Sequence, residues 1–186
     1  MILENLEEHI LVLKETISSY QNDINFVANE CIHRLKSGGK ILLLGNGGSA
    51  ADAQHMAAEL VGSFNNKKRP PLSAIALTTD SSILTSISND FSYETVFCRQ
   101  LKALASEKDV VIGISTSGES KNVINALKYA KEINCFVVGL SGNKGGALNK
   151  VSDKNIIVNS NRTSIIQEVH LFIEHQICTI IDQHFS

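Results

Sequence analysis

The sequence predicts an α/β fold with a doubly wound, five-stranded parallel sheet, a long N-terminal helix and a C-terminal helix. Three observations predict it: short apolar runs follow one another along the chain, helical stretches separate them, and amphipathic patterns occupy both ends. Apolar runs without alternation are typical of parallel strands, because helices cover both faces of such a sheet.

Residues 1–36 are predicted to form a long helix. Apolar side chains recur there at spacings of three and four, which is a heptad pattern. Its members are Leu3, Leu6, Ile10, Leu13, Ile17, Tyr20, Ile24, Val27 and Cys31. Such a stripe fits a helix packed on its own domain or one that meets another subunit, and its length favours the second. We therefore expect one domain over residues 1–186, with 1–36 as an N-terminal helical oligomerisation segment.

The β-like runs after this helix define five strands. They cover residues 40–45, 72–77, 109–115, 135–141 and 154–158. The "KKRPP" stretch, residues 67–71, is predicted to be a loop. From Ser164 to about Asp182 the apolar residues return to helical spacing, which predicts the C-terminal amphipathic helix.

Composition excludes several classes of protein. With 43% hydrophobic residues and a net charge of −2, the chain of 186 residues is typical of a globular protein, and the near-neutral charge argues against a nucleic-acid partner. The four cysteines are scattered, which favours free thiols. The acidic start does not resemble a signal peptide, and no apolar run is long enough to span a membrane. We therefore expect a cytoplasmic protein without a membrane partner.

Three predicted strands end in loops rich in glycine and hydroxyl groups: "GNGGSA", "STSGES" and "SGNKGG". Ligands of such sheets bind beyond the carboxyl ends of the strands, where helix N-termini favour anions. The first loop matches neither the P-loop nor the dinucleotide-binding pattern. One such loop could hold only ordinary helix caps, but two neighbouring ones favour a phosphate-bearing ligand. In the "STSGES" loop, the hydroxyl groups that would donate hydrogen bonds to the phosphate are those of Ser115, Thr116, Ser117 and Ser120.

His55 and Glu59 lie four residues apart in the helical stretch after the first loop, and so share one face. Alone, such a pair is typical of a solvated helix. The C-terminal helix, however, places polar residues, including Gln167 and His175, within an apolar pattern. His170 and His184 on that helix are interpreted as structural. A carboxylate and a histidine brought together from two helices would suit acid/base chemistry or a metal site.

Four stretches together resemble the phosphoheptose isomerases, a family with the flavodoxin-like SIS (sugar isomerase) fold. They are "GNGGSAADAQHMAAEL", "SNDFSYE", "GISTSGES" and "IQEVHLFIEH". The resemblance runs through essentially the whole chain. It implies an aldose-ketose isomerase that converts sedoheptulose 7-phosphate to D-glycero-D-manno-heptose 7-phosphate through an enediol, for bacterial surface heptoses in lipopolysaccharide or capsule.

The resemblance also implies roles for individual residues. Glu59 would be the base, and His175 its acid/base partner. Ser115, Thr116, Ser117 and Ser120 would bind the phosphate, while Asn46, Gly47, Gly48, Ser49, Asn89, Asp90 and Gln167, with Glu59, would contact the rest of the substrate. His55, Glu59, Gln167 and His175 match the family's zinc ligands, with no organic cofactor. The family forms homotetramers with sites at subunit interfaces.

Gln167 and His175 are eight residues apart, about 12 Å along a straight helix, so they share a metal only if their side chains converge. Gln is also a weak zinc ligand, and the acid/base roles are therefore favoured over the metal. Ser164 and Ile165 stand where relatives commonly carry Ala-Arg or Asp-Arg, so any sugar contact or ion pair made by that arginine is in doubt. Glu119 replaces a common Asn and brings negative charge towards the phosphate.

Two alternatives remain open at the level of sequence. The chain could be a non-catalytic SIS-domain binding protein of the DnaA initiator-associating type, or an isomerase of another sugar phosphate. Retention of Glu59 and His175 favours the enzyme over the binding protein.

Overall fold

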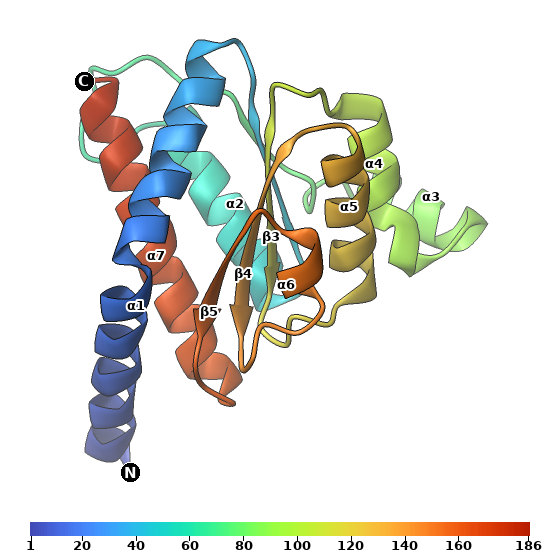
Figure 1. Ribbon diagram of the computed structural model, residues 1–186. Coiled ribbons are helices and arrows are strands. Elements are labelled where there is room, and N and C mark those ends of the chain that lie inside the picture. Colours follow the sequence, from blue (N-terminus) through green and yellow to red (C-terminus); the bar gives the residue numbers. More distant parts are fainter.

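The computed structural model describes residues 1–186 as a five-stranded parallel sheet between two layers of helices (Figure 1). The strands are β1 (Ile41–Gly45), β2 (Ala74–Ala76), β3 (Val110–Ser115), β4 (Phe136–Gly142) and β5 (Lys154–Val158). Their order, β2-β1-β3-β4-β5, is that of a flavodoxin-like sheet. The predicted fold class is thus confirmed. β2 is shorter than residues 72–77, because only Ala74–Ala76 pair with β1.

Helices cover both faces of the sheet. One layer holds α1 (Ile2–Lys36), α2 (Gly48–Val61) and α7 (Thr163–His184). The other holds α4 (Val96–Leu104), α5 (Lys121–Glu132) and α6 (Leu148–Val151), with α3 (Ser81–Asp90) and a 3-10 turn (Tyr93–Thr95) at its edge. Within β1, Ile41 and Leu43 join the first apolar core, whereas Leu42 joins the second. This two-sided burial explains why the strands read as unbroken apolar runs.

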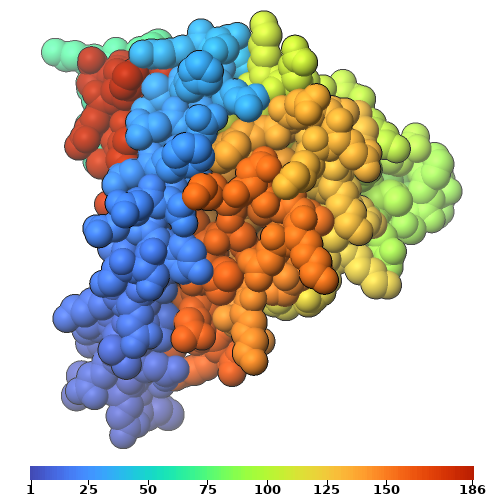
Figure 2. Space-filling view, in the orientation of Figure 1, coloured from blue at the N-terminus to red at the C-terminus, as the bar shows by residue number.

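The apolar stripe of α1 has two different environments. Val27 and Cys31, in its second half, are fully buried against the domain, and α1 packs along α7. Leu3 and Leu6, near its start, are 71% and 50% exposed. Figure 2 shows this end of α1 projecting past the body of the molecule. The stripe therefore serves the domain's own core in one half and leaves apolar side chains uncovered in the other.

The C-terminal helix and the cysteines are close to what the sequence predicts. α7 extends one residue before Ser164 and two beyond Asp182. All four cysteines are free, and burial raises the pKa of Cys135 to about 11, which leaves its thiol protonated. No helix is both long enough and apolar enough to cross a membrane.

Candidate active site

The two glycine-rich loops predicted to hold a ligand are joined in the structure. They follow β1 and β3, which are paired neighbours, so both loops leave the same edge of the sheet. The amide of Asn46 donates to Asn122 Oδ1 at 2.9 Å, and the amide of Asn122 donates back to Asn46 Oδ1 at 2.8 Å. Gly47 precedes α2 with φ +55°, a conformation that favours glycine. The first loop is thereby fixed to the first turn of α5.

The hydroxyl groups of the second loop form a cluster at the N-terminus of α5. Ser115 Oγ lies 2.9 Å from Ser120 Oγ and 3.4 Å from Ser117 Oγ. Ser120 occupies the N-cap position, but its hydroxyl makes no capping hydrogen bond. Thr116 is half-buried in the same loop. These hydroxyls lie at the positive end of a helix dipole. The cluster is therefore better suited to bind an anion than an ordinary helix cap is.

Glu119 is directed at a neighbouring loop. Its Oε1 accepts a hydrogen bond of 2.9 Å from the backbone N–H of Ala147, just before α6. The backbones also touch here, because a Cβ on Gly118 would lie 2.3 Å from the oxygen of Gly145. The third glycine-rich loop therefore braces the second, and the negative charge of Glu119 is engaged there.

His55, Glu59 and His175 converge from α2 and α7. His55 Nε2 lies 2.8 Å from His175 Nε2 and 3.6 Å from Glu59 Oε1. The side chains of His55 and Glu59 are 42% and 22% exposed. The structure therefore brings together a carboxylate and two imidazoles, which are groups able to accept, hold and return protons.

Gln167 lies elsewhere, beside the start of α2. Its amide nitrogen is 2.2 Å from the place where a Cβ on Gly48 would stand, so residue 48 needs to be glycine for this approach. His175 is about 12 Å farther along α7. Gln167 thus lies beside the first loop, whereas His175 lies beside His55 and Glu59.

The donor set partly fits a zinc ion. His175 Nε2 and Glu59 Oε1 lie close to His55 Nε2, and zinc accepts both imidazole nitrogens and carboxylate oxygens. As they stand, no three or more His, Cys, Asp or Glu side chains are placed to hold a metal ion, and Gln167 packs against Gly48. Three of the four implied ligands are therefore neighbours.

Asn89 and Asp90 end α3 as exposed side chains, hydrogen-bonded to each other at 2.8 Å. The residue of this segment that reaches the first loop is Tyr93, whose hydroxyl donates to Asn46 Oδ1 at 2.9 Å. Sequence reasoning missed both Tyr93 and Asn122 as partners of Asn46. Tyr93 belongs to the quoted "SNDFSYE" stretch, but Asn122 carries no signal of its own.

Buried polar groups lie behind the site. Glu174 is fully buried, neither of its carboxylate oxygens has a partner, and burial raises its pKa well above the ordinary value. Burial also raises the pKa of Asp52, while His55 opposes the shift. His170 donates from Nε2 to the carbonyl of Ser141, and burial lowers its pKa to about 4. His170 is therefore a neutral structural histidine, as predicted.

The departure at Ser164 and Ile165 also has a structural account. Ile165 is buried in the apolar core beneath the first turn of α7, while Ser164 is exposed. The arginine of this segment, Arg162, pairs instead with Glu8 of α1. The start of α7 is thus used for packing and for contact with α1.

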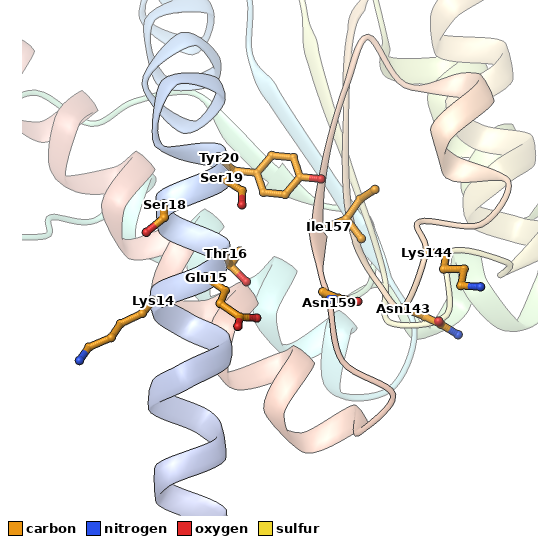
Figure 3. Close-up of a pocket in the computed structure, with 10 residues that line it drawn as sticks. All are labelled: Lys14, Glu15, Thr16, Ser18, Ser19, Tyr20, Asn143, Lys144, Ile157 and Asn159. Carbon is orange, nitrogen blue, oxygen red and sulfur yellow. The ribbon is translucent and has the colours of Figure 1, made fainter.

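A large surface groove, of about 630 Å³, lies away from these residues, between α1 and the ends of β4 and β5. Tyr20 reaches from α1 towards the strand segment at Ile157 and Asn159, whereas Lys14 points away (Figure 3). None of the predicted site residues lines it. The candidate site is therefore defined by its chemical groups and not by the size of a cavity.

Comparisons with known proteins show the family to which the chain belongs. Residues 6–142 match the SIS domain family. The chain is 50% identical to a phosphoheptose isomerase of Aliarcobacter butzleri, over 100% of this chain and 97% of the relative. It resembles the structure of a phosphoheptose isomerase from Neisseria gonorrhoeae (TM-score 0.91, 40% identity, 98% of this chain and 97% of that chain). It also resembles one from Francisella tularensis (TM-score 0.94, 37% identity, 98% and 96%).

Proposed function

The chain belongs to the SIS domain family and, within it, to the phosphoheptose isomerases, and on this premise we propose that it converts sedoheptulose 7-phosphate to D-glycero-D-manno-heptose 7-phosphate. The observation that carries the mechanism is the approach of His175 to the His55 and Glu59 pair. A non-catalytic binding role is set aside, because the full-length relatives are isomerases.

The proposed reaction moves one proton between C1 and C2. Glu59 removes the proton from C1 of the ketose, and the electron pair forms the enediol double bond. His175 gives a proton to the carbonyl oxygen at C2 and takes one from the hydroxyl at C1. The carboxyl proton of the partly exposed Glu59 exchanges with water before Glu59 gives a proton to C2, which yields the aldose and restores both side chains.

The phosphate would bind at Ser115, Thr116, Ser117 and Ser120. The sugar would extend from there past Asn46, Gly47, Gly48 and Ser49, with Asn89, Asp90 and Gln167 beside it. His55 lies about 10 Å along α2 from Gly48, so a substrate several carbons long would separate its phosphate from its reacting carbons.

Ser120→Ala should raise KM for the sugar phosphate about tenfold and leave kcat nearly unchanged, because one hydrogen bond to a charged group is worth about 1.5 kcal/mol. The Ser120 hydroxyl makes no capping bond, so the helix should lose little stability. Ser37→Ala is the matched control, since the Ser37 hydroxyl bonds only to the carbonyl of His33 at the end of α1. Steady-state kinetics that leave KM of Ser120→Ala at the wild-type value would remove Ser120 from the phosphate site.

Zinc is proposed as the metal, with His55, Glu59 and His175 as the residues that would hold it, whereas Gln167, the fourth implied ligand, packs against Gly48. When bound, it would polarise the substrate carbonyl as a Lewis acid. Elemental analysis of protein purified without chelator should find about one zinc per chain, and His55→Ala should lose it. His184→Ala, on the exposed end of α7, should keep the metal. Fully active protein without zinc would leave His55 as a substrate contact.

Assembly is proposed as a homotetramer in the cytoplasm, with sites at subunit interfaces. The exposure of His55 supports this, since enediol chemistry benefits from a site closed to water. The uncovered Leu3 and Leu6 of α1 support it too. Light scattering should give the mass of four chains, and a monomer at working concentration would contradict it. The product would supply surface heptoses of lipopolysaccharide or capsule.

The substrate assignment is tested by NMR of the purified protein with sedoheptulose 7-phosphate. The signals of the seven-carbon aldose phosphate should grow at the expense of the ketose signals. D-Arabinose 5-phosphate, supplied separately, should react far more slowly. Faster turnover of the five-carbon sugar would identify an isomerase of another sugar phosphate.

A further inference from the structure

Arg69 is a buried cation in the loop after α2. It is 6% exposed, and its Nε donates to Asp182 Oδ1 of α7 at 2.6 Å. The second oxygen of Asp182 accepts a hydrogen bond of 2.9 Å from the backbone N–H of Asn66, in the same loop. Both oxygens of this buried carboxylate are therefore satisfied by the segment that leaves α2.

The guanidinium of Arg69 also holds the last turn of α2. Nη1 donates to the carbonyl of Leu60 at 2.9 Å, and Nη2 donates to the carbonyl of Glu59. Carbonyls at the end of a helix have no partner within the helix, and a cation there also complements the helix dipole. The turn that Arg69 fixes is the one that carries Glu59.

The same loop touches the second acid/base side chain. The ring of Phe64 stacks on the imidazole of His175, with centroids 5.5 Å apart and planes inclined by 17°. Phe64 lies between the end of α2, which Arg69 holds, and Asn66, which Asp182 holds, so the loop is tied on both sides of Phe64. One ion pair thus anchors both the Glu59 turn and the stacking partner of His175.

We propose that Arg69 and Asp182 form a positioning clamp that holds Glu59 and His175 in register for proton transfer. The inference rests on the proposed roles of Glu59 and His175. Neither clamp residue takes part in proton transfer, and each acts through the backbone or ring that it fixes. Lysine in place of Arg69 could keep the charge opposite Asp182, but it lacks the planar fork that reaches two carbonyls of α2 at once.

A purely stabilising ion pair is the competing explanation, and the molecule contains a matched control for it. Asp109 is buried and accepts hydrogen bonds from the backbone and side chain of Lys40 and from Ser106 N–H. This pair lies where β1 and β3 begin, and none of its hydrogen bonds reaches α2 or α7. Loss of either carboxylate charge should lower the melting temperature, but only the clamp contacts the Glu59 turn.

The experiment compares Arg69→Lys, Asp182→Asn and Asp109→Asn with wild-type protein. Both clamp variants should lose on the order of 10- to 100-fold in kcat with KM changed by less than about threefold, since misplacement of reacting groups acts on the transition state. Asp109→Asn should keep kcat within about twofold at a similar loss of melting temperature. If Asp182→Asn does not fold, the milder Arg69→Lys decides the result.

A second measurement does not depend on turnover. The ring current of Phe64 shifts the ring-proton NMR signals of His175 upfield, and release of the loop in Arg69→Lys should move these signals back downfield. Asp109→Asn should leave them unchanged. Failure of wild-type protein to isomerise any sugar phosphate would refute the proposed function, while the His175 shift would still report on the clamp. Wild-type kcat together with an unshifted His175 in Arg69→Lys would overturn the clamp.

Discussion

Glu59→Gln should lower isomerase turnover by on the order of 10³-fold while the protein stays folded. Glutamine has nearly the same shape and can still hydrogen-bond to His55, but it cannot accept a proton from carbon. Glu59 is partly exposed and belongs to neither apolar core, so the fold does not depend on its charge. Steady-state kinetics and a thermal melt of the same preparation check both parts of the prediction.

The control for this change is Gln54→Glu, which alters charge on the same helix at an exposed side chain. It should leave turnover within about threefold of wild type, because a solvent-exposed charge interacts only weakly with its neighbours through water. A Glu59→Gln enzyme with more than about a tenth of wild-type kcat would remove Glu59 from the role of base.

His175→Gln should lower kcat on the order of 10²-fold, because the substituted side chain can hydrogen-bond to the substrate oxygens but cannot exchange protons near neutral pH. The stacking contact with Phe64 would also be lost. The measurement is kcat and KM with sedoheptulose 7-phosphate. His184→Gln, on the exposed last residue of the same helix, should behave as wild type. Equal kinetics of the two variants would contradict an acid/base role for His175.

The fold could be predicted because its signals are local. The strands β1, β3 and β4 are buried on both faces, so their sequences are unbroken apolar runs, and the return to helical spacing marks α7. The stripe on α1 predicted the helix but not its two environments. Heptad spacing does not say which partner covers each turn, and Val27 and Leu3 carry the same signal despite opposite burial.

The candidate site could be predicted only as far as its residues stand in recognisable motifs. The spacing of His55 and Glu59 placed them on one face, but the approach of His175 joins residues 120 positions apart. The place of Gln167 depends on how α7 lies against Gly48, which no periodicity encodes. Asn122 and Arg69 look like ordinary helix and loop residues, and their roles depend on hydrogen bonds to residues far away in the sequence.

Proton transfer through Glu59 is the central claim, and isomerisation of sedoheptulose 7-phosphate in deuterated water tests it most directly. The wild-type enzyme should introduce deuterium at the carbon that receives the proton, C2 of the aldose product, as observed by NMR and mass spectrometry. Glu59→Gln should introduce none over the same period. Product formed by wild-type enzyme without any deuterium, or deuterium exchange at the wild-type rate in Glu59→Gln, would contradict the account.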